Sequence, residues 1–407
     1  MMLAHLSDLH VADGHRLEDQ RRVLDWIVDD ATAAGDVEAW LITGDLYGRA
    51  VPHEPSVRER AALEPVLVRM ALIAPVVVLV GNHDQDGVAL RLRDLGGTFP
   101  VNVVTGAQVV TVHTSSSPID VYGLAYPSPR MLLAGERMPS SREALNAAVA
   151  ERLQALLGIW RARMLEGARR GRRAVFAGHF AVSGAVTSGG EVLGHHEPEL
   201  AAADLEALPV AYGALGHLHR RQEPARGWWY AGSPWATDFG EREAKSYTLV
   251  DLDGPKAVVT PRPTPCRRVL TLDWRWAPDR EGGQPRWVTR PTEEQLAAVA
   301  GAEVRARLIV PDQWVAGCPF DAELARLQEL DAWHVQAERR IEPTLRVRAP
   351  AVAEAPDLPR KVEAFWSTRA TRPDPREAAA ALLALDELRG NGDDAINAAT
   401  EALLEVA

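Results

Sequence analysis

The sequence predicts an α/β protein in which two sheets pack face to face and are flanked by helices. Strand-like and helix-like segments alternate over residues 1–260, and strand-like runs stand at both ends of that order. Three prolines within residues 261–265 then form a stiff, extended connector. We therefore expect a large domain at 1–260, a small α+β domain at 266–347 and a C-terminal helical segment at 360–407.

The elements of the large domain follow from hydrophobic periodicity and from the residues that interrupt it. Apolar side chains recur at helical spacing over Leu17–Ala34, and Gly35 ends that helix. Pro65 is expected to disturb a second helix. In chain order we expect strand Leu3–Leu6, helix Leu17–Ala34, strand Trp40–Thr43, helix Ser56–Leu72, strand Val76–Val80, strands Val101–Val112 and Ile119–Leu124, helix Arg142–Arg163, and strands Ala174–Ala177 and Ala211–Leu215.

The second domain and the tail contain shorter elements. The expected order in the domain is strand Val269–Leu272, helix Glu293–Ala300, strand Glu303–Val310, helix Asp321–Leu330 and strand His334–Ile341. No ligand motif occurs in these elements. In the tail, Lys361–Trp366 and Glu377–Leu388 are predicted as two short helices, with a weaker one at Ala395–Leu404.

Composition limits the classes of protein to which this chain can belong. With 407 residues, of which 46% are hydrophobic, it is long enough for two domains with proper cores. The two cysteines give no disulfide framework, the start lacks a signal-peptide pattern, and no apolar run is long enough to span a membrane. We therefore expect a cytoplasmic protein. The net charge of −11 argues against a protein that coats nucleic acid by itself, although metal ions and a partner can supply positive charge locally.

Five strand-like runs each end in side chains that commonly bind metal ions. The five stretches are Ser7–His10, Gly44–Tyr47, Gly81–Asp84, Gly178–Phe180 and Gly216–His219. Ligands bind in open α/β sheets just beyond the carboxyl ends of the strands, so five such ends can converge on one pocket. An isolated histidine is more often a satisfied structural residue, but the series as a whole predicts a dinuclear metal centre.

Seven side chains in these stretches are candidate metal ligands: Asp8, His10, Asp45, Asn82, His179, His217 and His219. Their mixture of oxygen and nitrogen donors suits manganese, iron, cobalt or zinc better than magnesium or calcium. Cys266 and Cys318 lie far downstream, which argues against a thiolate zinc site. Asp45 stands in the middle of the order, so it is the natural bridge between two ions. Two ions about 3.5–4 Å apart can hold the attacking and departing oxygens of a phosphoryl centre.

The two residues after Asn82 are candidates for roles other than metal binding. If Asn82 faces the metals, His83 must project differently, and it is better placed to stabilise or protonate a leaving oxygen. Asp84 can hold the His83 ring by hydrogen bonding, or it can cap the helix that follows the strand. Both interpretations of Asp84 stay open at this point.

The motif series resembles that of the calcineurin-like metallophosphoesterase superfamily over about residues 1–220. A narrower match follows, in which G-S-P at 232–234, F-x-E at 239–241 and K-x-Y at 245–247 resemble the SbcD/Mre11 nuclease-subunit family. The resemblance implies a two-sheet metallophosphoesterase sandwich with a second domain that caps the metal cleft, and it implies His83 as the catalytic histidine. The implied ligands are Asp8, His10, Asp45 and His219 for one ion, and Asp45, Asn82, His179 and His217 for the other.

By this resemblance the chain is expected to be a DNA phosphodiesterase, an exonuclease on double strands and an endonuclease on single strands or hairpins. It would use two divalent ions, with manganese favoured and iron, cobalt or zinc as alternatives. The expected partners are DNA and an SMC-like ATPase of the SbcC/Rad50 type, with a homodimer inside the complex and no membrane. The segment at 360–407 would dock on the coiled-coil root of that ATPase, or it could pack back on the second domain.

Two positions depart from the family pattern. Val11-Ala12 follows His10 where Leu-Gly is common, and Gly48 stands where some relatives carry a second functional histidine. The second departure bears on strand-end preference and leaves metal binding intact. Two other functions stay open: a phosphodiesterase or phosphatase for small molecules, which would be active alone, and a scaffold that bridges DNA and its partner.

Three further features have both a structural and a functional interpretation. The basic cluster Arg169–Arg173 could touch a phosphate backbone, but a solvated turn is favoured. Trp228, Trp229 and Trp235 could stack on bases, and core or cap contacts are favoured for at least two of them. The pair His195–His196 could bind metal, although the seven candidate ligands already fill the site.

Overall fold

The computed structural model describes residues 1–48, 54–95, 97–189, 199–254, 256–280 and 283–343, together with Arg360 and Ala364. The predicted helices of the tail and the pair His195–His196 lie outside the described residues, so the expectations for them stay predictions. Among the described helices, none is both long enough and apolar enough to cross a membrane.

The first sheet has six strands and a parallel centre. Its strands lie in the order β14 (Val258–Pro263), β13 (Ser246–Asp251), β1 (Met2–Leu6), β2 (Val37–Thr43), β3 (Val76–Leu79) and β4 (Val101–Val104). Strands β1 to β4 run parallel, with Leu3 opposite Ala39 and Trp40 opposite Val76, whereas β13 joins β1 antiparallel. The carboxyl ends of β1, β2 and β3 therefore lie at one edge of this sheet.

The second sheet also has six strands with a parallel centre. Its order is β11 (Gln222–Ala225), β12 (Trp228–Tyr230), β10 (Tyr212–Gly216), β7 (Arg173–His179), β6 (Ile119–Leu124) and β5 (Ala107–Val112). Strands β12, β10, β7 and β6 run parallel, and antiparallel strands β11 and β5 form the edges. Strands β8 (Ala181–Val182) and β9 (Glu199–Leu200) form a separate short pair.

Alternation along the strands distributes apolar side chains to both faces of each sheet. On β2, Leu41 lies in a buried cluster that also contains Val175 of the second sheet. Its neighbour Trp40 points the other way, into a cluster that contains Leu24 and Leu67 from outside the sheet. The two sheets therefore pack face to face, which confirms the predicted sandwich.

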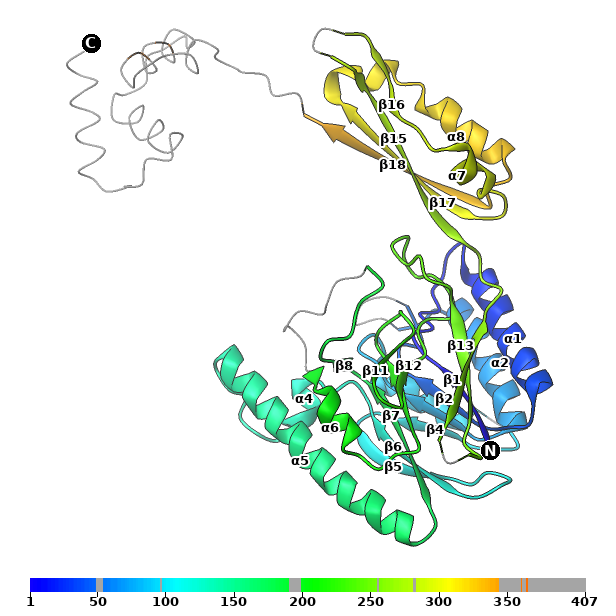
Figure 1. The fold of residues 1–407 in the computed structure, drawn as a ribbon, viewed down its shortest axis with the longest axis vertical. Helices are drawn as coiled ribbons and strands as arrows, with labels where there is room; N and C mark the ends of the chain where they lie inside the picture. The colour runs from blue at the N-terminus through cyan, green and yellow to red at the C-terminus, as the bar shows by residue number, and fades with distance from the viewer. Residues whose placement is uncertain are drawn as a thin grey trace. The chain divides into compact units, whose positions relative to one another are not determined.

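Helices cover the outer faces of the two sheets (Figure 1). α1 (Leu17–Ala34) and α2 (Val57–Ile73) cover the first sheet, while α5 (Arg142–Arg169) and α6 (Ala202–Glu206) cover the second. α1 has the predicted bounds, because its buried residues form one stripe at helical spacing. Shorter elements are α3 (Asp86–Arg91), the 3-10 helix η1 (Leu92–Asp94) and α4 (Pro129–Leu132).

Three predicted elements differ from those of the structure. α2 continues through Pro65, because buried neighbours such as Val66 and Leu67 hold it against the core despite the hydrogen bond that proline removes. α5 continues past Arg163 to Arg169. The run predicted as one strand at Val101–Val112 is two strands, β4 in the first sheet and β5 in the second. A continuous apolar run looks the same in both cases, so periodicity could not reveal this crossing between sheets.

The strands after the proline-rich connector form a four-stranded sheet in the order β16 (Pro285–Thr289), β15 (Val269–Pro278), β17 (Glu303–Pro311) and β18 (His334–Glu342). The intervening elements are α7 (Glu293–Ala297), the 3-10 helix η2 (Asp312–Gly317) and α8 (Phe320–Glu329). Every element predicted for this region is present. The sequence did not predict β16, since this strand is largely exposed and carries little hydrophobic signal.

The described residues divide into two compact units. The first contains Met1–Trp274, Thr289–Leu308 and Pro319–Glu338. The second contains Arg275–Val288, Ile309–Cys318 and the described residues from Arg339 onward. All seven candidate ligands lie in the first unit. The predicted domain boundary at the proline-rich connector stays a prediction.

Candidate metal centre

The candidate ligands lie at or just beyond the carboxyl ends of five parallel strands. Asp8 and His10 follow β1, Asp45 follows β2, Asn82 follows β3, His179 ends β7, and His217 and His219 follow β10. Hydrogen bonds join the loops, because Asp8 N donates to Gly44 O (3.1 Å) and His10 N donates to Asp45 O (2.9 Å). The carboxylates extend these links: Asp45 Oδ1 accepts from His83 N (3.0 Å), and Asp8 Oδ1 accepts from His217 N (3.0 Å). Loops far apart in the sequence are thereby fixed to one another.

The backbone at the ligands adopts an uncommon conformation. Among the described residues, five that are not glycine have positive φ, and four of these are candidate ligands: Asp8 (52°), His10 (42°), Asp45 (54°) and His217 (102°). Such conformations cost about 1–3 kcal/mol each and persist only where the surrounding structure enforces them, most often at functional sites. The strain indicates that these loops are shaped for the positions of their side chains and not for stability.

Close approach explains the glycines that precede the ligands. A Cβ atom on Gly81 would lie 2.0 Å from Asp45 Oδ1, and one on Gly44, where φ is 94°, would lie 2.2 Å from His179 Nδ1. Both distances are far below van der Waals contact, so any side chain at these positions would displace a candidate ligand. The glycines of the sequence motifs therefore have a steric role.

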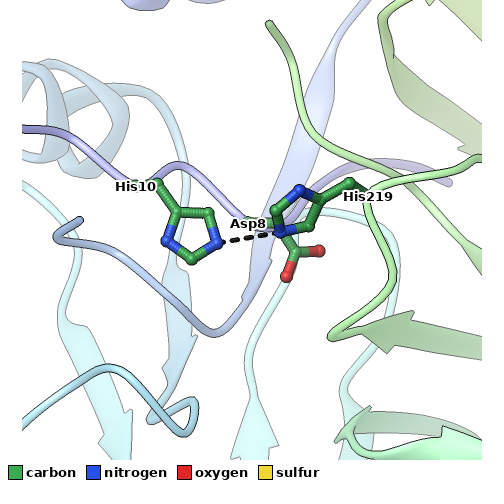
Figure 2. Close-up of side chains that lie close together, drawn as sticks. All are labelled: Asp8, His10 and His219. Carbon is green, nitrogen blue, oxygen red and sulfur yellow. Dashed lines mark hydrogen bonds between the residues drawn. The ribbon is translucent and has the colours of Figure 1, made fainter. Parts of the chain in front are cut away.

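The first ligand group consists of Asp8, His10 and His219. His10 Nε2 lies 3.0 Å from His219 Nε2, and Figure 2 shows the two rings facing each other with the Asp8 carboxylate beside them. The Asp8 carboxylate is fully buried and also accepts a hydrogen bond from Ser7 Oγ (2.5 Å). Two imidazole nitrogens and a carboxylate thus converge from β1 and β10, which belong to different sheets.

The second ligand group consists of Asn82, His179 and His217. Asn82 Oδ1 lies 2.9 Å from His179 Nε2 and 3.1 Å from His217 Nδ1. The carbonyl oxygen of Thr43 accepts a hydrogen bond from His179 Nδ1 (2.7 Å), which leaves a lone pair on Nε2 of the neutral ring. That lone pair faces the Asn82 oxygen, and a cation that binds both atoms would satisfy these two acceptors together. The donor set therefore fits a metal ion.

Asp45 connects the two ligand groups. Its Oδ2 atom lies 3.5 Å from His10 Nε2 and 3.5 Å from His179 Nε2. The side chain is almost completely buried, and its other oxygen is occupied by the backbone N–H of His83. One carboxylate oxygen is therefore placed between a histidine of each group, as a bridging ligand requires.

Burial and charge set the protonation states of the site. Burial lowers the pKa of His10 to about 4, although Asp45 opposes this effect. Burial also disfavours the charged form of His179, but the carboxylates of Asp45 and Asp8 outweigh it and raise the pKa of His179 to about 9. Burial would raise the pKa of Asp45, yet His179 and His10 outweigh it and hold that pKa below its usual range. At neutral pH Asp45 is therefore ionised and His10 is neutral, while His179 carries a proton that a bound cation would have to displace.

His83 lies beside the ligands and faces open space. It lines a cavity of about 480 Å³ together with His10, His219 and Phe239. Its ring centroid lies 5.1 Å from that of His10, and among the described residues its Nδ1 atom has no hydrogen-bond partner. The Nδ1 atom is buried, so only the other atoms of the ring are available to a molecule in the cavity.

Asp84 has neither of its two predicted roles. Its Oδ2 accepts from Gly81 N (2.9 Å), and its Oδ1 accepts from Leu46 N (2.9 Å) and, at 3.4 Å, from the next backbone N–H of that loop. The Nδ1 atom of His83 has no hydrogen bond to it, and the N-cap position of α3 is Gln85. Burial and the nearby Asp45 raise the pKa of Asp84 to about 7. Asp84 therefore fastens the loop after β3 to the loop after β2.

Sequence reasoning gave no role to Glu241 and Lys245, which the structure places at the centre. Glu241 Oε1 accepts from His219 Nδ1 (2.7 Å), and Lys245 donates to the other carboxylate oxygen. Both side chains are buried. Glu241 and Lys245 belong to the F-x-E and K-x-Y motifs, which could have indicated that they are functionally important. The motifs do not show which metal ligand these side chains contact.

The other ambiguous features follow the structural interpretation. Trp228 and Trp235 are buried in core clusters. The half-buried Trp229 packs against Arg221, whose Cζ atom lies 4.4 Å from the centroid of the indole ring. The basic cluster Arg169–Arg173 lies at the turn before β7, where Glu166, Asp120 and a backbone carbonyl accept its hydrogen bonds. These contacts favour the solvated turn over a phosphate-binding role.

A further group of metal-type side chains occurs within the first unit: His15, Glu303 and His334. His15 Nε2 contacts Glu303 Oε1 at 2.9 Å, and Arg16 donates to both oxygens of the same carboxylate at 2.7 and 3.0 Å. The rings of His15 and His334 stack at 4.0 Å. Since Arg16 already neutralises Glu303, this group is satisfied as an ion pair.

The family model of the calcineurin-like phosphoesterases matches residues 1–221. The chain belongs to this family. It is 27% identical over 349 residues to the SbcD subunit of nuclease SbcCD from Rhodobacter capsulatus, with 79% of each chain covered. It is 30% identical over 276 residues to the SbcD subunit of nuclease SbcCD from Bacillus subtilis, with 62% of this chain and 66% of that protein covered. Among solved structures, NAD nucleotidase of Haemophilus influenzae is 10% identical with a TM-score of 0.36, and the match covers 81% of this chain and 60% of that one.

These comparisons confirm the predicted resemblance to the metallophosphoesterases and to SbcD. The chain is a phosphoesterase of a family that uses divalent metal ions, and the matched residues include all seven candidate ligands. The match ends near β11, before the segment that carries Glu241 and Lys245. The similarity to the Rhodobacter protein extends well beyond it.

Proposed function

We propose that this chain is a DNA phosphodiesterase with a dinuclear metal centre. It would act as an exonuclease on double strands and as an endonuclease on single strands or hairpins. The observation that carries the proposal is the position of Asp45 Oδ2, 3.5 Å from a histidine nitrogen in each ligand group. A carboxylate in this position can bind two ions at once, and manganese is the favoured metal for this mixture of donors.

The residues of each ligand group have defined tasks in this proposal. Asp8, His10 and His219 would hold one ion, and Asn82, His179 and His217 the other, with Asp45 shared between them. When bound, two such ions supply Lewis acidity that activates water and neutralises charge on the phosphate. Strained backbone and buried carboxylates hold these ligands in place before substrate arrives.

His83 is the proposed general acid. Its ring lines the cavity next to His10 and His219, although its Nδ1 atom is buried, so the proton would come from the other ring nitrogen. A proton delivered from this ring to the departing sugar oxygen would remove the need to expel an alkoxide. Asp84 supports the reaction only indirectly, because it holds the loops that carry Asp45 and His83.

The partners follow from the relatives. Two similar proteins carry the name of the SbcD subunit of the nuclease SbcCD, so we propose DNA as the substrate and an SbcC-type ATPase as the partner. A homodimer within that complex and a cytoplasmic location belong to the same proposal. The net charge of −11 is compatible with it, because the bound ions and the partner would supply positive charge near the DNA.

The decisive experiment supplies three substrates to the purified chain with manganese. These are a labelled hairpin duplex, bis-p-nitrophenyl phosphate and a cyclic nucleotide, and metal content is measured on the same sample. We expect two ions per chain and cleavage of the hairpin, both reduced in an Asp45→Asn variant. Cleavage of the small esters without the DNA would instead indicate a small-molecule phosphodiesterase. Binding of DNA without any hydrolysis would indicate a scaffold.

A further inference from the structure

Glu241 lies directly behind His219. It contacts the ring nitrogen that does not face His10. His219 Nδ1 lies 2.7 Å from Glu241 Oε1, while Nε2 of the same ring faces His10 Nε2 at 3.0 Å. The imidazole therefore stands between a buried carboxylate and the position proposed for an ion. Figure 2 shows this ring opposite His10, with the Asp8 carboxylate beside both.

These contacts fix the tautomer of His219. An ionised carboxylate can only accept, so Nδ1 must carry a hydrogen, and in the neutral ring Nε2 then presents its lone pair to Asp8 and His10. The hydroxyl of Thr237 strengthens the arrangement, since Oγ1 donates to Glu241 Oε1 (2.5 Å) and lies 2.9 Å from His219 Nδ1. Rotation of the ring would break both contacts.

Lys245 holds the carboxylate in position. Its buried ammonium donates to the second oxygen of Glu241, to Ser233 Oγ (3.0 Å) and to the carbonyl oxygen of His219 (3.3 Å). It also donates to Glu243 Oε1 (2.7 Å), so the buried charge is fully paired. The same cation thus binds the backbone of the ligand and the carboxylate that orients its ring.

The second ligand group has a different support. The back nitrogen of His179 donates to the neutral carbonyl oxygen of Thr43 (2.7 Å) and not to a carboxylate. A carboxylate partner raises the basicity of a metal-bound imidazole more than a carbonyl does, because it carries a full negative charge. His219 and His179 are therefore supported by different kinds of acceptor, a carboxylate and a backbone carbonyl.

We propose that Glu241, held by Lys245, is a positioning residue that strengthens metal binding at the first ligand group and leaves the second unaffected. This inference rests on the proposed dinuclear centre. Glu241 acts through His219 and touches neither substrate nor ion. Loss of an outer partner of this kind typically weakens metal binding by about 10–100-fold.

The test compares Glu241→Gln with Glu243→Gln. Both residues contact Lys245, but of the two only Glu241 contacts His219, so the second variant is a matched control. Manganese titration by calorimetry should resolve one site that weakens by about 10–100-fold in Glu241→Gln and one that does not change. Electron paramagnetic resonance at low manganese should then show isolated ions where the wild type shows coupled pairs. Glu243→Gln should match the wild type in both measurements.

Thr237→Val provides a second, milder perturbation if Glu241→Gln folds poorly. It keeps the carboxylate and removes only the hydroxyl that donates to it, so we expect a smaller loss at the same single site. Equal weakening of both sites, or unchanged affinities in both variants, would overturn the inference. A wild-type chain that binds only one ion would refute the dinuclear centre. In that case the role of Glu241 is supported if Glu241→Gln lowers the affinity for the single ion. It is refuted if that affinity is unchanged.

Discussion

Replacing His83 by alanine should reduce turnover strongly while both metal ions stay bound. The ring lines the cavity beside the first ligand group, and among the described residues no side chain accepts a hydrogen bond from its Nδ1 atom. The backbone N–H that supports Asp45 is retained in the variant. A general acid contributes about 10²–10⁴-fold, which corresponds to roughly 3–5 kcal/mol of transition-state stabilisation. The change should appear in kcat, since the ring acts on the leaving group and not on substrate affinity.

The loss should depend on the leaving group. A sugar oxygen leaves poorly without a proton, whereas p-nitrophenolate leaves readily as an anion. We therefore expect His83→Ala to reduce cleavage of a DNA strand by the full factor and to reduce hydrolysis of bis-p-nitrophenyl phosphate much less. Single-turnover rates for both substrates, with metal content measured by mass spectrometry, provide the comparison.

His113→Ala is the matched control for this variant. His113 is exposed and follows Val112, which pairs with Ile119 at the amino end of β6, whereas the candidate ligands lie at the carboxyl ends of the parallel strands. Its removal should therefore change neither rate nor metal content. A His83→Ala enzyme with near-normal rates on DNA would refute the assignment. So would a variant that has lost an ion, because His83 would then be a ligand. An equal loss on both substrates would rule out proton transfer to the leaving group.

Three further predictions concern other parts of the chain. Asp45→Ala should abolish turnover and remove at least one ion from a folded protein, and wild-type stoichiometry in a calorimetric titration would contradict the bridging role. Burial would raise the pKa of Glu38, but hydrogen bonds from Ser116 and Ser115 outweigh it and lower that pKa to about 2. Glu38→Gln should therefore destabilise the fold at neutral pH, and the difference should vanish as the pH falls from about 4.5 to 2; urea unfolding that shows a constant difference would disprove this. Truncation before Lys361 should preserve metal content and small-ester hydrolysis but abolish capture of an SbcC-type ATPase, whereas loss of metal would place residues 361–407 in the core.

The sequence alone was sufficient for the long helices and the buried strands that precede the candidate ligands, but it did not predict the short pair β8 and β9, strands β11 to β14 or β16. The helix Leu17–Ala34 has the predicted bounds, because a stripe of apolar residues at helical spacing and a closing glycine are local signals. The ends of the strands that carry the candidate ligands could also be predicted, since these ligands lie at or just after the ends of buried apolar runs. Where the prediction was wrong, at Val101–Val112, an unbroken apolar run concealed a crossing from one sheet to the other.

The residue types of the site could also be predicted, but not all of their contacts. His83 and Asp84 are neighbours in the sequence, yet the Asp84 carboxylate turns away to the backbone of the loop after β2. His219 and Glu241 are separated by β11 and β12, and no periodicity connects them. Such contacts depend on where loops from different strands meet.

The sequence by itself therefore determined which side chains are candidate metal ligands and the order of the strands that carry them. Apolar periodicity is a property of a few adjacent residues, so it can be read directly from the chain. The tertiary structure decided that Asp8, His10, Asp45 and His217 take positive φ, and that Asp45 Oδ2 lies between the two ligand groups. It did so because strained conformations and facing lone pairs are unfavourable for an isolated segment, and only the packing of two sheets with their loops bonded together can hold them.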